Sequence, residues 1–266
     1  MTTDILTAFL LTSLAGLSTG VGSLIAFLAK GSNERFLSVS LGFSAGVMIY
    51  VSMIEIFSEA RESLTDYMGT VKGSWLTVAA FFAGMLIIAA IDRLIPSEDN
   101  PHEFAHREGR SSAPGASRLM RTGLFTALAL AVHNFPEGMA TFVSAMQEPE
   151  IALPIVAAIG IHNIPEGIAV SVPIYRATGS RAKAFALSFL SGLAEPLGAL
   201  LGWLVLMPFI TEAVFGAVFA AVAGIMVFIS LDELLPAARE YGEHHLSIYG
   251  LISGMMVMAV SLLLFM

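Results

Sequence analysis

The hexapeptide HNFPEG at residues 133–138 recurs as HNIPEG at residues 162–167. Both copies follow the pattern H-N-x-P-E-G, and both lie inside long apolar stretches. Ionisable side chains within a membrane are costly and typically mark a functional site. Because the same arrangement occurs twice, we interpret the two copies as halves of one site. We expect the rest of the fold to be arranged around this site.

The composition indicates an integral membrane protein. Of the 266 residues, 56% are hydrophobic and only 13% are charged, and the mean hydropathy is +0.80. Soluble domains carry about 25% charged residues. A spanning helix needs roughly 20 mainly apolar residues. Eight segments qualify: 5–29, 37–58, 74–95, 121–146, 151–174, 182–206, 212–235 and 246–265. The predicted fold is therefore all-α, with eight transmembrane helices in a single domain over residues 1–266.

The distribution of Lys and Arg predicts the orientation of the helices, because cytoplasmic loops are enriched in these residues. Arg61 and Lys72 lie between spans two and three. The other basic residues lie in or beside the odd-numbered loops: Lys30, Arg35, Arg93, Arg107, Arg110, Arg118, Arg121, Arg176, Arg181, Lys183 and Arg239. Odd loops are therefore predicted to be cytoplasmic and both termini external. The loop at about 96–118, rich in Ser, Gly, Pro and charge, is expected to be flexible.

Helical spacing gathers the polar side chains of each hexapeptide. Residues i and i+4 share a helix face, so the His and Glu of each copy point the same way. Two such helices face to face would offer imidazoles, carboxylates and amide oxygens: His133, His162, Glu137, Glu166, Asn134 and Asn163. Such a set suits a divalent transition metal. The alternative, that each His and Glu only makes an interhelical hydrogen bond, stays open.

Further acidic residues within the apolar segments suggest a path for a cation. Glu195 lies deep in the sixth span and could complete the site, while Glu55 lies late in the second span, near the outer face. Asp232 and Glu233 lie late in the seventh span, at its inner end. Carboxylates thus mark an outer, a middle and an inner position. For Asp232 and Glu233, a solvated helix end is nearly as good an interpretation.

Residues 102–106 match H-E-x-x-H, the pattern of zinc hydrolases. An intramembrane zinc metalloprotease using His102, Glu103 and His106 is therefore an alternative function. That chemistry needs both His on one packed helix, with a third ligand in a shielded cavity. Here the pattern lies in the polar loop and precedes a run of Gly, Ser and Pro. Chance, or weak metal capture by the loop, is the better interpretation.

With the paired motifs placed, the chain resembles the ZIP family of metal-ion transporters, in particular its bacterial members. The resemblance extends to LGFSAGVM at 41–48, SGLAEPLG at 191–198 and DELLP at 232–236. It implies a 3+2+3 arrangement of spans with an inverted repeat. It also implies a two-site metal centre. The principal site would comprise His133, Glu137, Glu166, His162 and Met48, and the second Asn134, Asn163 and Glu195, with Glu137 and Glu166 shared.

The resemblance implies uptake of divalent metal into the cytoplasm, zinc first, with Fe2+, Mn2+ or Co2+ tolerated. Some relatives have Gln at the position of His162 and Asp at that of Asn163, which could alter metal preference. Zinc is expected as cargo, with no cofactor and no enzymatic activity, in a multi-pass protein of the cell inner membrane. The expected partners are metal ions and membrane lipid. A formal net charge of −8 argues against nucleic acid. A homodimer, and a metal-gated sensor without flux, are left open.

Overall fold

A computed structural model describes residues 2–28, 34–94, 115–147, 149–206, 211–240 and 244–264. The described residues are helical apart from short turns. Most of the predicted flexible loop lies outside them, as do all three residues of the H-E-x-x-H alternative: His102, Glu103 and His106.

The helices cover the predicted spans, but the polar break predicted after residue 58 is wrong, because the second span continues as a helix to Met68 and the third begins at Thr70. The first half contains α1 (Thr2–Leu28), α2 (Glu34–Val51), the π-helical segment η1 (Ser52–Ile56), α3 (Phe57–Met68) and α4 (Thr70–Leu94). The centre contains α5 (Gly115–Gln147) and α6 (Pro149–Thr178). The second half contains α7 (Arg181–Gly192), α8 (Ala194–Leu201), η3 (Gly202–Leu206), α9 (Glu212–Ile229), η4 (Ser230–Leu234), α10 (Leu235–Glu240) and α11 (His244–Leu264).

The all-helical fold class is confirmed for the described residues, and the chain is a membrane protein by composition. In the described part, six segments are long and apolar enough to span a membrane: Ile5–Leu28, Arg35–Met68, Thr70–Ile91, Arg181–Val205, Glu212–Glu240 and His245–Leu264. Helices α5 and α6 are not among the six. They carry the two hexapeptides. The eight-span topology therefore remains a prediction.

Local residue chemistry explains where several helices begin and end. Gly69 and Gly179 have positive φ values of 88° and 67°, which glycine adopts readily, and they end α3 and α6. Ser180 caps α7 by accepting a hydrogen bond from the Lys183 amide at 3.2 Å. Thr211 caps α9 in the same way. Helices α3 and α4 are joined by the single residue Gly69.

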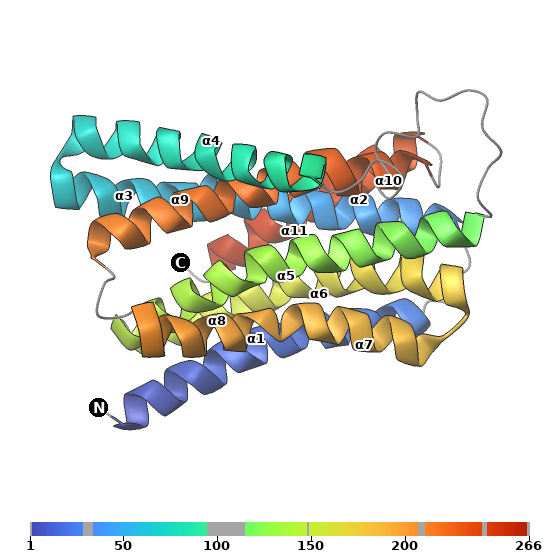
Figure 1. Cartoon of the computed structure of the whole chain (residues 1–266), viewed down its shortest axis with the longest axis horizontal. Coiled ribbons are helices and arrows are strands. Elements are labelled where there is room, and N and C mark those ends of the chain that lie inside the picture. Colours follow the sequence, from blue (N-terminus) through green and yellow to red (C-terminus); the bar gives the residue numbers. More distant parts are fainter. Residues whose placement is uncertain are drawn as a thin grey trace.

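The helices lie side by side along the bundle and form two groups (Figure 1). In the central group, α1 packs on α6 and α7, and α5 packs on α6 and α8. In the flanking group, α2 packs on α11, α9 packs on α4, and α3 packs on both α4 and α9. Contacts of α2 with α6 and of α5 with α9 join the two groups.

Within each group, helices approach backbone to backbone at glycines. A Cβ added at these positions would overlap a carbonyl oxygen of the neighbouring helix. Such close approach is typical of small residues in membrane helix interfaces. The pairs are Gly22 with Ile164 and Gly167 with Thr19, Gly138 with Glu195 and Gly198 with Phe135, Gly46 with Leu251 and Gly254 with Phe43, and Gly84 with Ala221 and Gly224 with Phe81.

Apolar side chains cover much of the outside of the bundle, and polar side chains are frequent inside. Large apolar residues such as Leu86, Trp75 and Leu264 are 70%, 74% and 78% exposed. Fully buried positions include many hydroxyl, amide and carboxyl side chains. This inversion of the soluble pattern suits a lipid environment and leaves a polar interior in which a site can form.

We expect Gly22→Ala to destabilise the protein, because its Cβ would overlap the Ile164 carbonyl. Overpacking of this kind costs about 1–3 kcal/mol. Thermal unfolding of the detergent-purified protein, followed by tryptophan fluorescence, measures the effect. Gly160→Ala is the matched control, since its Cβ would meet nothing nearer than Ser18 Oγ at 3.7 Å. Equal melting temperatures for the two variants would contradict the packing argument.

Candidate metal centre

Helices α5 and α6 pack against each other and carry the two hexapeptides (Figure 1). Both helices continue through their proline, Pro136 in α5 and Pro165 in α6. A proline has no amide N–H, so the carbonyl of residue i−4 loses its usual helical donor. Non-standard backbone of this kind is tolerated within a membrane where it is buried in protein or lines a cavity.

The His of the first hexapeptide contacts the Glu of the second. The Nε2 atom of His133 lies 3.0 Å from Glu166 Oε1, within hydrogen-bond distance, and 3.8 Å from Glu137 Oε2. His133 and Glu166 are fully buried, and Glu137 is 3% exposed. Three of the predicted ligands are therefore brought together across the α5–α6 interface.

The two asparagines are held by backbone carbonyls of other helices. Asn163 Nδ2 donates to the Ala15 carbonyl on α1 at 3.0 Å and also to Glu195 Oε1 on α8. Asn134 Nδ2 donates to the Ser191 carbonyl on α7 at 3.3 Å. A carbonyl oxygen can only accept, so these bonds fix which end of each amide is the NH2 group.

The orientation leaves ligand-type oxygens available in a buried region. Among the described residues, Oδ1 of Asn134 and of Asn163 has no hydrogen-bond partner, and neither has Oε2 of Glu166 or of Glu195. Buried acceptors without partners are rare in folded proteins. Amide and carboxylate oxygens are also the groups that bind divalent cations. The chemistry of these residues therefore fits a cation.

Glu195 lies within Coulombic range of both Glu137 and Glu166. Like charges gathered in an apolar interior are unfavourable unless a positive charge compensates them. The described part of the chain nevertheless contains no three His, Cys, Asp or Glu side chains already spaced as ligands of one ion. One physical reason is that His133 and Glu166 bond directly to each other.

Comparison with known proteins decides the family. The sequence profile of the family described as ZIP Zinc transporter matches residues 93–262. The chain belongs to the ZIP family. It is 69% identical to the zinc transporter ZupT of Streptococcus mutans over 265 residues, which is 100% of both chains. It is 65% identical to zinc transporter ZupT of Oceanobacillus iheyensis, with 98% of each chain covered, and 60% identical to that of Clostridium perfringens, with 98% and 97% covered.

Members of this family are transporters and not enzymes, so zinc is cargo here rather than a cofactor. Membership confirms the predicted family resemblance. It also argues against the protease interpretation of the H-E-x-x-H pattern.

The remaining predicted residues are placed with less detail. Met48 is fully buried in α2, which packs on α6. His162 belongs to α6, but its side chain lies outside the described part of the chain. Glu55 is half-buried in η1, and Asp232 and Glu233 are half-buried in η4. The roles of all five residues stay predictions.

Sequence reasoning missed several residues that adjoin the predicted path. From Ser52 outward, polar side chains recur at i+3 and i+4 along η1 and α3, a spacing that places them on one helix face. The spacing can be read from the sequence. Besides the predicted Glu55, the face comprises Ser52, Glu59, Glu62 and Asp66. Ser52 is buried, and its hydroxyl has no hydrogen-bond partner in the described structure.

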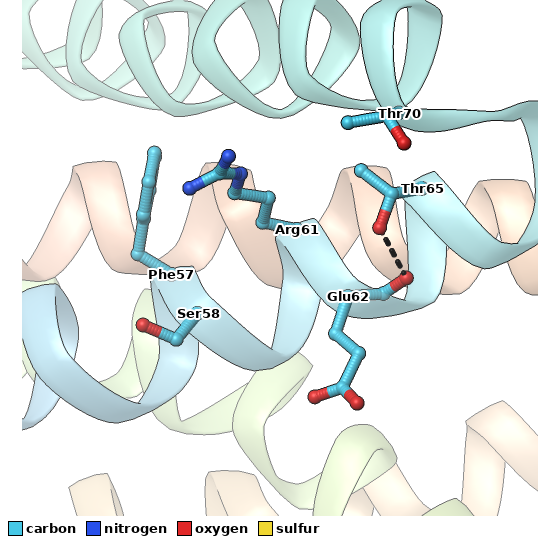
Figure 2. Close-up of a pocket in the computed structure, with 6 residues that line it drawn as sticks. All are labelled: Phe57, Ser58, Arg61, Glu62, Thr65 and Thr70. Atoms are coloured by element: carbon cyan, nitrogen blue, oxygen red, sulfur yellow. Dashed lines mark hydrogen bonds between the residues drawn. The ribbon is translucent and has the colours of Figure 1, made fainter.

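A cavity of about 370 Å³ lies between α3 and α4, beside this face. It is lined by Phe57, Ser58, Arg61, Glu62, Thr65 and Thr70. Figure 2 shows Arg61 directed toward α4, where its Nε donates to Ser74 Oγ at 3.3 Å, and Glu62 directed away from α4. The guanidinium is thus turned away from the Glu62 carboxylate.

We expect Asn163→Asp to lower the melting temperature in the presence of EDTA, because it replaces the donor to Ala15 with an acceptor beside Glu195. Zinc should then raise the melting temperature by more than it does in the unmodified protein, since a ligand with charge has been added. Thermal unfolding with and without zinc measures both effects.

The matched control is Asn163→Ala, which loses the same donor without adding a ligand. Its response to zinc should not exceed that of the unmodified protein. A zinc response of Asn163→Asp no larger than that of Asn163→Ala would contradict a cation at this position.

Proposed function

We propose that the chain carries divalent transition metal into the cytoplasm, with zinc as the principal cargo, across the cell inner membrane. The observation that carries the proposal is the buried cluster in which His133 lies 3.0 Å from Glu166 and 3.8 Å from Glu137, while Glu195 accepts a hydrogen bond from Asn163 beside them. A divalent cation would compensate two of the three negative charges of this cluster. The names of the similar bacterial proteins supply the choice of zinc.

The metal centre is proposed to have two adjacent sites. Two contacts support this division. His133 bonds to Glu166, whereas Asn163 bonds to Glu195. The principal site would contain His133, Glu137, Glu166, His162 and Met48, and the second Asn134, Asn163 and Glu195, with Glu137 and Glu166 shared. On entry, a cation would replace the hydrogen bond between His133 and Glu166.

We further propose eight spans in a 3+2+3 arrangement, with both termini outside and an inverted repeat. Helix packing supports the repeat, because α1 packs on α6 as α8 packs on α5, and α2 packs on α11 as α9 packs on α4. In this correspondence η1 matches η4, so that Glu55 corresponds to Glu233. The first and last helices also have their chain ends at the same end of the bundle (Figure 1).

The proposed path runs from the outer end of α3 to the inner end of η4. Glu55 and the acids on its helix face would attract a cation from outside, since a row of like charge raises the local cation concentration. Asp232 and Glu233 would receive it on the cytoplasmic side. The π-helical segments η1 and η4 hold acidic residues, and π-helical turns frequently mark functional positions.

Selectivity would follow from the ligand types. Imidazole and carboxylate bind zinc, iron and cobalt well, and the amides of Asn134 and Asn163 would admit manganese. The sequence has no GxxxxGK[ST] loop, so direct use of ATP is not expected. Ligands must be deprotonated to bind metal, so uptake should weaken at acid pH.

Zinc uptake into proteoliposomes tests the site. We expect Glu137→Ala and Glu166→Ala to reduce uptake by roughly 100-fold or more, because removing one member of a buried charged cluster typically costs about 3–5 kcal/mol. Glu212→Ala is the matched control, since Glu212 is an exposed residue in the first turn of α9. Uptake by both site variants equal to that of the control would refute the assignment.

Deleting about residues 98–117 tests the loop. Zinc uptake should largely survive the deletion, because none of the proposed ligands lies in the segment. A metalloprotease built on His102, Glu103 and His106 could not survive it. Uptake abolished in a variant that still folds, as judged by gel filtration, would show that the loop is required for transport.

A further inference from the structure

Helices α1 and α7 contact α6 and α5, respectively, through equivalent hydrogen bonds. Asn163 donates to the Ala15 carbonyl of α1, and Asn134 donates to the Ser191 carbonyl of α7. The next residue in each case is a glycine, Gly16 or Gly192, and a Cβ added at either would lie against the carbonyl of the other. The two asparagines are thus held in the same way by two different helices.

The correspondence continues along these helices. Gly22 on α1 meets α6 at Ile164 and Gly167, and Gly198 on α8 meets α5 at Phe135. Gly16 and Gly22 have the same separation in sequence as Gly192 and Gly198. When Gly16 is aligned with Gly192, Thr19 on α1 occupies the position of Glu195 on α8. Since Glu195 accepts a hydrogen bond from Asn163, Thr19 is the counterpart residue for Asn134.

The hydroxyl of Thr19 behaves differently from other buried threonines in helices. Thr12, Thr77 and Thr141 each donate to the carbonyl one turn earlier, at 2.8–2.9 Å. Thr19 is fully buried, and within the described structure its Oγ1 has no hydrogen-bond partner. A buried hydroxyl that makes no bond of its own is destabilising unless something else uses it.

The position of Thr19 brings its hydroxyl toward the peptide that holds Asn134. A Cβ added at Gly192 would lie 2.9 Å from both Cβ and Oγ1 of Thr19. Gly192 follows Ser191, whose carbonyl accepts from Asn134. The Oδ1 atom of Asn134 also has no partner among the described residues. Two buried oxygens without partners therefore belong to residues that meet at one peptide.

We propose that Thr19 Oγ1 and Asn134 Oδ1 form a neutral oxygen subsite for the transported divalent cation, as the uncharged counterpart of the Glu195–Asn163 pair. The proposal rests on the transport function proposed above and adds Thr19 to its residues. Neutral oxygens bind a divalent cation more weakly than carboxylates do, because the Coulombic attraction is smaller. A cation would therefore be held firmly beside Glu195 and loosely beside Thr19.

Two substitutions separate the hydroxyl from the shape of the side chain. Thr19→Val keeps the branched shape and loses the oxygen, while Thr19→Ser keeps the oxygen and loses a methyl group. We expect Thr19→Val to lower the maximal rate of zinc uptake into proteoliposomes roughly tenfold, the effect of losing one bond to a charged partner. Thr19→Ser should retain most of the rate.

Thr12→Val is the matched control, because Thr12 is equally buried on the same helix and its hydroxyl bonds to the Ala8 carbonyl. It should transport at the unmodified rate. Loss of rate in Thr19→Ser with retention in Thr19→Val would assign Thr19 to packing and overturn the proposal. So would unmodified rates in both variants. Loss of uptake in Glu166→Ala alongside unchanged Thr19 variants would overturn this subsite only, leaving the main function in place.

Discussion

The constraint on which the structure depends is the gathering of carboxylates inside an apolar bundle. Glu137, Glu166 and Glu195 come from three helices and lie within range of one another. Gathering like charges in an apolar interior is unfavourable, and hydrogen-bond donors or a bound cation reduce the cost. The donors are supplied by His133 and Asn163, and each of them bonds to a different carboxylate. The packing of these three helices therefore provides the donors and acceptors on which the proposed metal centre depends.

Close helix approach makes this convergence possible. Gly138 meets the backbone at Glu195, and Gly167 meets the backbone at Thr19, so each hexapeptide ends at a residue without a side chain. A larger residue at 138 would push α8 away and move the Glu195 carboxylate out of reach of Asn163. A larger residue at 167 would push α1 away and move the Ala15 carbonyl out of reach of the same side chain. The Gly of each motif thus serves the site through packing, and its Pro serves it by leaving a backbone carbonyl without its usual donor.

Composition and the length of the apolar stretches sufficed to predict an all-helical membrane protein, and the repeated hexapeptide directed attention to the α5–α6 interface. They did not reveal that the closest contact of His133 would be with Glu166 on the other helix rather than with Glu137 on its own. They also missed the backbone partners of Asn134 and Asn163, which depend on how α1 and α7 pack. Helix spacing shows which side chains share a face, whereas packing between distant segments decides which faces meet.

The glycine contacts have a mechanical consequence. Among the described residues, every glycine that meets another helix meets one of its own group, central or flanking, and none bridges the two. Within each group the helices are thus in close backbone contact at glycines, and no described glycine makes such a contact between the groups. The central group contains all five polar residues, whereas Met48 belongs to the flanking group. The five are His133, Glu137, Asn163, Glu166 and Glu195. A sliding motion between the two groups would keep these nitrogen and oxygen atoms together and would move only the Met48 sulfur relative to them.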